Sequence, residues 1–173
     1  RCTIIGDKPP WFTGHYIKQH KLKNRSGFRD MLAKVRTMAT HKEIAEDFVW
    51  MMDDDYFLKP FTFEEIVVPR AEKFRRSKAN EWQRIKSASM DILTGLGLPN
   101  NDFATHAPHY VEKQKLAKIC EQHDLKHRLF TWELLYGNTY HHTPERCRPF
   151  LSRVGIQMSV EQLQVVTRKA TVL

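Results

Sequence analysis

The sequence predicts a single α/β domain, because short β-rich runs alternate with longer segments of helical spacing over its 173 residues. Hydrophobic residues make up 41% of the chain, enough for one packed core, and one domain is the default below about 200 residues. The near-continuous apolar run at residues 47–52 is typical of a strand covered on both faces, as in a parallel or mixed sheet.

The first half of the chain alternates strand, loop and helix. Residues 1–5 form a β-rich run that the following Pro9 and Pro10 prevent from continuing, and residues 7–25 are expected to form a loop. Helical spacing begins after Ser26, which is a suitable N-cap. The apolar face of this helix consists of Phe28, Met31, Leu32, Val35 and Met38.

The second half is predominantly helical. We expect a helix from the second half of the basic stretch 70–86 to Gly95, followed by a short strand or loop over residues 102–105. Two further helices are expected over residues 111–121 and 125–136. Gly137 and Asn138 are expected to end the last helix.

The charge balance points to an anionic partner. Lys and Arg number 28 against 20 Asp and Glu, which gives a formal net charge of +8. The composition excludes a disordered tail, a collagen-like chain and a coiled-coil rod, and no apolar run approaches the roughly 20 residues of a membrane span. The basic residues form either a solvated surface or a groove for the phosphates of a sugar nucleotide or a nucleic acid.

Three widely spaced cysteines indicate a reducing compartment. The number of cysteines is odd and they are far apart, which argues against both a disulfide framework and a zinc knuckle; they are Cys2, Cys120 and Cys147. We therefore expect a cytoplasmic protein. The chain starts without Met or a signal peptide, and its first residues already have the pattern of a buried strand, so we expect an upstream part to be missing.

Three consecutive aspartates follow the apolar run directly. Asp53, Asp54 and Asp55 repel one another, and a bound divalent cation is the usual compensation. Because side chains alternate along an extended segment, Asp53 and Asp55 would face one way and Asp54 the other. Two carboxylates at the carboxyl end of a strand suit Mg²⁺ or Mn²⁺ together with a diphosphate. The alternative is an acidic surface turn without a ligand.

Histidines are further candidates for metal binding or proton transfer. Two of the nine form the pair His106 and His109, and two more are the neighbours His141 and His142; both pairs lie in expected loops. Neighbours on the chain do not easily face one point, so only one of the second pair is expected to act, and His141 is our candidate for completing the acidic metal site. The alternative for each is a surface or capping histidine.

Three stretches of the chain resemble phage and bacterial glycosyltransferases of the GT-A type, which in turn are similar to the Stealth family of capsule sugar-phosphate transferases. These stretches are residues 4–12, 47–61 and 106–109. The Stealth segment N-D-D-x-F-L corresponds to residues 53–58, where Asp53 replaces the family's Asn. The family's H-x-P corresponds to His106-Ala107-Pro108.

A shorter match extends the resemblance toward the C-terminus. Tyr136-Gly137-Asn138 is similar to a Tyr-Gly-Asn that recurs in the phage members. The resemblance spans residues 2–142, so we treat residues 143–173 as a C-terminal extension of one glycosyltransferase domain.

The resemblance implies a GT-A-like mixed or parallel sheet flanked by helices, with part of the N-terminal nucleotide-binding region missing. It implies a D-x-D pair, Asp53 and Asp55, that binds Mn²⁺ or Mg²⁺, with Asp55 as the more direct ligand. His106 would lie near the reacting phosphate or complete the metal site. By analogy with the Stealth enzymes, Arg128 would neutralise a phosphate.

Other residues are assigned to the nucleotide-sugar donor and to proton transfer. Besides Asp53, we expect Asp54, Lys8 and Lys59 to contact the donor, the two lysines by stabilising its leaving diphosphate. If the reaction inverts the sugar carbon, a carboxylate must act as base on the acceptor hydroxyl. The candidates for this base are Asp102 and Glu133.

These observations favour a metal-dependent glycosyltransferase in the cytoplasm, which is the bacterial host's cytoplasm if the chain is phage-encoded. The acceptor would be anionic, with modified phage DNA and a polysaccharide as candidates. One alternative is a Stealth-type sugar-1-phosphate transferase, in which His106 and Arg128 act at the transferred phosphate. Another is a non-catalytic basic module that binds nucleic acid.

Overall fold

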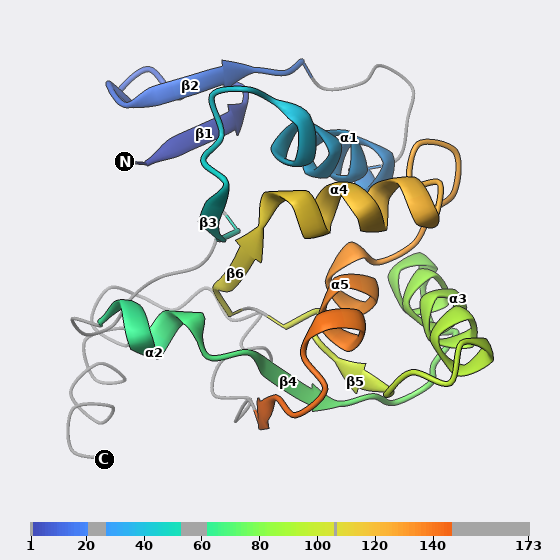
Figure 1. Cartoon of the computed structure of the whole chain (residues 1–173). Coiled ribbons are helices and arrows are strands. Elements are labelled where there is room, and N and C mark those ends of the chain that lie inside the picture. Colours follow the sequence, from blue (N-terminus) through green and yellow to red (C-terminus); the bar gives the residue numbers. More distant parts are fainter. Residues whose placement is uncertain (1, 21–26, 53–61, 106, 147–173) are drawn as a thin grey trace, which may run out of the picture.

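The structure, a computed structural model, describes residues 2–20, 27–52, 62–105 and 107–146 (Figure 1). These residues form a mixed α/β structure, which confirms the predicted class. The helices are α1 (Gly27–Thr40), α2 (Phe63–Val67), α3 (Glu81–Gly95), α4 (Lys113–Gln122) and α5 (Trp132–Tyr140). The strands are β1 (Thr3–Gly6), β2 (His15–Lys18), β3 (Asp47–Trp50), β4 (Arg70–Lys73), β5 (Asn101–Asp102), β6 (His109–Glu112) and β7 (Glu145–Arg146).

The described strands form three small sheets. β1 pairs in parallel with β2, and β3 pairs antiparallel with β6. In the third sheet β4 lies in the middle, antiparallel to β5 and parallel to β7. The pairing is therefore mixed, but within the described ranges it does not produce the one broad sheet flanked by helices that the resemblance implied.

Two expectations for the first half are wrong. The sequence predicts a loop over residues 7–25, whereas β2 lies within it, because Ile17 pairs with Ile5 and is buried. The strand β3 is not covered on both faces. Asp47 is exposed and the other three residues are half-buried, since a two-stranded ladder can turn one face to the core and the other to solvent.

Helices α1 and α3 form where the helical spacing predicts them. Leu32, Val35 and Met38 of α1 are buried in the core, where this helix packs on α4, whereas Phe28 and Met31 are half-buried. Gly97, with a φ of 67°, follows the end of α3 in the left-handed region that favours glycine. Ser26, the expected N-cap of α1, lies outside the described residues. Within the described part of the chain, the search for a helix of the length and apolarity of a membrane span found none.

The two C-terminal helices differ from the prediction at their ends. β6 extends through Glu112, so α4 begins two residues later than predicted. α5 begins at Trp132 rather than at residue 125. It also continues through Gly137 and Asn138, where the sequence predicts its end. Both residues have tertiary roles inside the helix that outweigh their tendency to end one.

Every residue of α5 from Trp132 to Asn138 is buried, and Figure 1 shows this helix lying between α4, α3 and β5. The Asn138 side chain accepts a hydrogen bond from the Asn101 N–H and donates one to the Asn101 carbonyl, both at 2.8 Å. The Tyr136 hydroxyl accepts a 2.9 Å hydrogen bond from the Glu112 N–H. The Tyr-Gly-Asn stretch thus ties α5 to β5 and β6.

Gly137→Ala is expected to lower the free energy of unfolding by about 1–3 kcal/mol, the usual cost of overpacking a core. A Cβ at this position would lie 2.3 Å from the ring of Phe103. Urea denaturation measures the change. Gly95→Ala is the matched control, because nothing lies within 4 Å of its added Cβ; it should be neutral or slightly stabilising. Equal effects of the two substitutions would contradict the close approach of Phe103 to α5.

Candidate functional site

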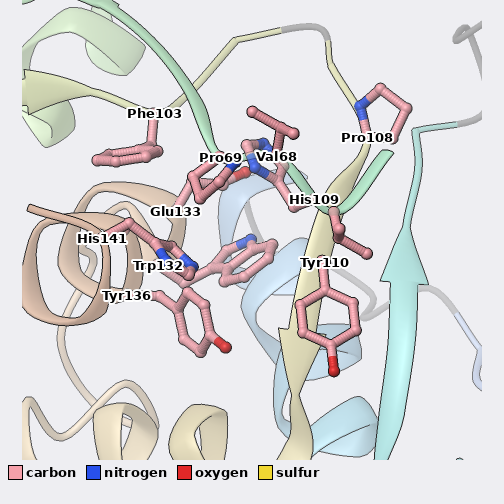
Figure 2. Close-up of a pocket in the computed structure, with 12 residues that line it drawn as sticks. Val68, Pro69, Phe103, Pro108, His109, Tyr110, Trp132, Glu133, Tyr136 and His141 are labelled. Carbon is pink, nitrogen blue, oxygen red and sulfur yellow. The ribbon is translucent and has the colours of Figure 1, made fainter. Parts of the chain in front are cut away.

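A small cavity lies where α5 meets β6 and the segment after α2 (Figure 2). Its volume of about 20 Å³ admits one water-sized group, since a buried water needs roughly 10–15 Å³. β6 contributes His109 and Tyr110, α5 contributes Glu133 and Tyr136, and His141 follows directly after α5. The remaining lining is mostly apolar. The cavity therefore combines a few polar groups with a low-dielectric surround.

Among the described residues that line this cavity, Glu133 supplies the carboxyl group. It lies in the first turn of α5 with only 7% of its surface exposed. Burial raises the pKa of its carboxyl to about 7; its own backbone N–H and then Lys86 oppose this rise, whereas Asp102 adds to it. At neutral pH both the acid and the base form of Glu133 are therefore populated.

Two polar atoms of the cavity wall have no hydrogen-bond partner among the described residues. They are Oε2 of Glu133 and Nε1 of Trp132. The Trp132 side chain is close enough to stabilise the Glu133 carboxylate and lower its pKa slightly, although the two atoms are not in hydrogen-bonding geometry. An acceptor and a donor therefore lie next to each other, unsatisfied, at the wall of a cavity that admits one small polar group.

Lys86 of α3 and Asp102 of β5 form a buried ion pair beside Glu133. Asp102 also accepts a 3.1 Å hydrogen bond from the Ala104 N–H. The Lys86 ammonium contacts Asp102, so its effect on Glu133 is at longer range. The structure thus brings together the two carboxyl groups that the sequence offers as bases, but gives only Asp102 a cation in direct contact.

Two histidines line the cavity with lowered pKa values. Burial and then the neighbouring His141 lower the pKa of His109 to about 4, while a backbone hydrogen bond to Thr105 opposes this. His109 keeps part of its surface exposed, but its ring packs against Trp132 with 6.0 Å between centroids. Burial likewise lowers the pKa of His141. Both imidazoles are therefore neutral at pH 7, the form that accepts a hydrogen bond or binds a metal.

The structure separates the predicted site residues into two groups. Glu133 and His141 line the cavity, and Asp102 lies beside it. Lys8 is exposed between β1 and β2, and Arg128 is exposed with its guanidinium carbon 5.5 Å from the centroid of the Phe130 ring. Neither of these two basic residues lines the cavity.

The predicted acidic site and its neighbours lie outside the described residues. These positions are Asp53, Asp54, Asp55, Lys59 and His106. The strand that precedes them is described, and its last residue, Trp50, is opposite His109 in the antiparallel register. The Trp50 ring also packs against Trp132, 6.3 Å between centroids. The strand before the acidic run therefore ends beside the cavity.

The described residues do not form a metal site by themselves. A search of them finds no group of three or more His, Cys, Asp or Glu side chains that could hold a metal ion. His141 can offer one nitrogen from the cavity wall. The carboxylates that Mn²⁺ or Mg²⁺ prefers would have to come from Asp53 and Asp55.

The sequence interpretation missed the position of His109, which it grouped with His106 in a loop. The alternation of His109 and Val111 with Tyr110 and Glu112 is the signal that could have shown a strand here. Trp132 is fully buried, yet it also lines the cavity. The helical spacing of the apolar residues in this segment could not show that second role.

Comparison of the chain with protein-family models, with curated proteins and with solved structures gives no match. The functional argument therefore uses the chemistry of the cavity. A carboxyl group with a pKa of about 7 can take a proton from a hydroxyl group near neutral pH. A single water-sized space beside it matches the size of one such hydroxyl.

Glu133→Gln should change how stability depends on pH. The folded-state pKa of about 7 lies above the ordinary value of 4.5, so Glu133 reduces stability as pH rises from about 4.5 through 7, by roughly 3 kcal/mol in all. Glutamine does not ionise. The melting temperature of Glu133→Gln relative to the natural chain should therefore increase by several degrees between about pH 5 and pH 8.

The control for this measurement is Glu121→Gln, which changes an exposed glutamate on α4. His109, whose pKa is lowered, contributes stability that is lost as pH falls from 6.5 through about 4. That contribution is common to the natural chain and to the variants, so it cancels in the difference. A difference for Glu133→Gln that is the same at all pH values would mean that Glu133 ionises normally.

Proposed function

We propose that this chain is a metal-dependent glycosyltransferase that moves a sugar from a nucleotide-sugar donor to an acceptor hydroxyl, with Glu133 as the base. The observation that carries the proposal is the position of this carboxyl. It is buried, its pKa is about 7, and it lines a cavity beside the end of β3, the strand that leads into the triple aspartate.

The proposed step is a direct displacement at the anomeric carbon. The Glu133 carboxylate accepts the proton of the acceptor hydroxyl while the hydroxyl oxygen forms a bond to that carbon. The bond from the carbon to the diphosphate oxygen breaks, and the nucleoside diphosphate leaves with the electron pair. A base is most effective when its pKa is near the working pH, which is the case for Glu133 at pH 7.

The proposal assigns metal binding to Asp53 and Asp55 from the sequence alone. A bound Mn²⁺ or Mg²⁺ would neutralise the negative charge of the diphosphate. His141, neutral and on the cavity wall, is suited to add a nitrogen ligand. A GT-A-like arrangement and a cytoplasmic location belong to the same proposal; the odd number of cysteines in the sequence supports a reducing compartment.

The alternative reactions receive less support from the described residues. Phosphosugar transfer of the Stealth type would use Arg128, which is exposed, packs against Phe130 and does not line the cavity. A nucleic-acid module would use the basic stretch at residues 70–86. Two of its cations already have carboxylate partners, since Lys86 contacts Asp102 and Arg76 contacts Asp91.

A thermal-shift screen of nucleotide sugars with and without Mn²⁺ tests the proposal. We expect one donor to raise the melting temperature by several degrees at about 100 times its Kd, and only with the metal. Asp55→Ala should abolish this shift. The control is Asp91→Ala, which removes an exposed aspartate and an ion pair of small energetic value. A donor shift that needs no metal and survives Asp55→Ala would contradict the proposed metal site.

Product analysis with the selected donor separates the possible reactions. Glycosyl transfer releases nucleoside diphosphate, whereas phosphosugar transfer releases nucleoside monophosphate. Glu133→Gln should lower kcat by roughly 10²–10⁴-fold, the usual contribution of a general base, and should leave the metal-dependent donor shift intact. An unchanged kcat would exclude Glu133 as the base.

A further inference from the structure

An exposed aromatic side chain stands beside the cavity. Phe63, the first residue of α2, has 60% of its surface exposed. Its ring meets that of Tyr110 edge-on, with 6.0 Å between centroids, and α2 contacts β6 along this side (Figure 1). Tyr110 also lines the cavity, as Figure 2 shows. We name the pair Phe63 and Tyr110 the aromatic shelf.

Among the described residues, the charged groups that act on Tyr110 of the aromatic shelf are the carboxylates of Asp47 and Glu112. Asp47 lies diagonally across the ladder from Tyr110, and after burial it is the main cause that raises the pKa of the Tyr110 hydroxyl. Glu64, which follows Phe63, is exposed. Glu112 shares the face of β6 that carries Tyr110, and it holds the Lys115 ammonium in an ion pair. Such surroundings disfavour a phosphate group and favour a ligand with hydroxyl donors.

The cavity that Tyr110 lines has room for one hydroxyl group. The unpartnered Nε1 of Trp132 is a donor and the unpartnered Oε2 of Glu133 is an acceptor, and both residues are more than nine-tenths buried. A hydroxyl is able to donate to one and accept from the other. The volume of about 20 Å³ is sufficient for this group and too small for a phosphate with its four oxygens.

We propose that the aromatic shelf and the cavity together bind an uncharged carbohydrate ring as the acceptor. One ring hydroxyl occupies the cavity between Trp132 Nε1 and Glu133 Oε2, while the apolar C–H face of the sugar lies on the exposed ring of Phe63, which Tyr110 meets edge-on. Asp47 and Glu64 accept hydrogen bonds from other hydroxyls. The role as acceptor rests on the proposed glycosyl transfer, and it replaces the anionic acceptor that the net charge of +8 suggests.

A glycan array probed with the full-length chain, without donor or metal, tests this proposal. The array carries neutral oligosaccharides together with phosphorylated and carboxylated glycans. Binding to double-stranded DNA is measured separately. We expect retention on at least one neutral glycan, and loss of about ten-fold or more of its affinity in Phe63→Ala. The matched control is Leu96→Ala, which removes an exposed apolar side chain of similar exposure, 52%, from the end of α3; its binding should equal that of the natural chain.

Retention on charged glycans or DNA alone would overturn the proposal, and so would the absence of retention on every neutral glycan. Neutral binding that Phe63→Ala leaves unchanged would also overturn it. The result is independent of the proposed reaction. If the chain binds a neutral glycan but shows no metal-dependent donor shift, the glycosyltransferase proposal is wrong and the carbohydrate site remains. If it shows the donor shift but binds no neutral glycan, the carbohydrate site is wrong and the glycosyltransferase proposal remains.

Discussion

The burial of α5 is the constraint on which the rest of the described structure depends. Because this helix is enclosed from Trp132 to Asn138, each polar side chain on it must find a partner inside the protein or carry a cost. Asn138 and Tyr136 find theirs on β5 and β6. One oxygen of Glu133 has no hydrogen-bond partner among the described residues. Burial raises the pKa of this carboxyl, so its proton is retained to higher pH.

The contrast between two neighbouring carboxyl groups gives the cavity its chemistry. Asp102 lies against the Lys86 ammonium and accepts a backbone hydrogen bond. The Lys86 ammonium acts on Glu133 only at longer range, and the other residues that line the cavity are mostly apolar. Different environments for adjacent carboxyls are a common way to give one of them an acid–base role. The imidazoles of His109 and His141, whose pKa values burial lowers, also line this cavity.

Local sequence patterns predicted the helices α1 and α3. α1 follows the 3.6-residue spacing of its apolar side chains, and α3 ends at Gly95, with Gly97 shortly after it. The extent of α5 could not be predicted, because Gly137 is needed for the close approach of Phe103 and Asn138 for its bonds to Asn101, and both are tertiary contacts. Of the site, the sequence offered Glu133, Asp102 and His141 individually. The pairing of β3 with β6, and the packing of Trp50 and His109 against Trp132, involve residues far apart in the chain. The acidic run at residues 53–55 stays a prediction.

The central claim is that Glu133 exchanges its proton near neutral pH, and a carboxyl titration followed by ¹³C NMR tests it most directly. The chain would be labelled at the glutamate side-chain carboxyl carbon, and the Glu133 signal would be assigned by its absence in Glu133→Gln. We predict a titration midpoint of about 7 for this signal. A midpoint at the ordinary value of 4.5 would show that Glu133 is ionised at neutral pH like a surface glutamate, and the account of the cavity as an acid–base site would be wrong.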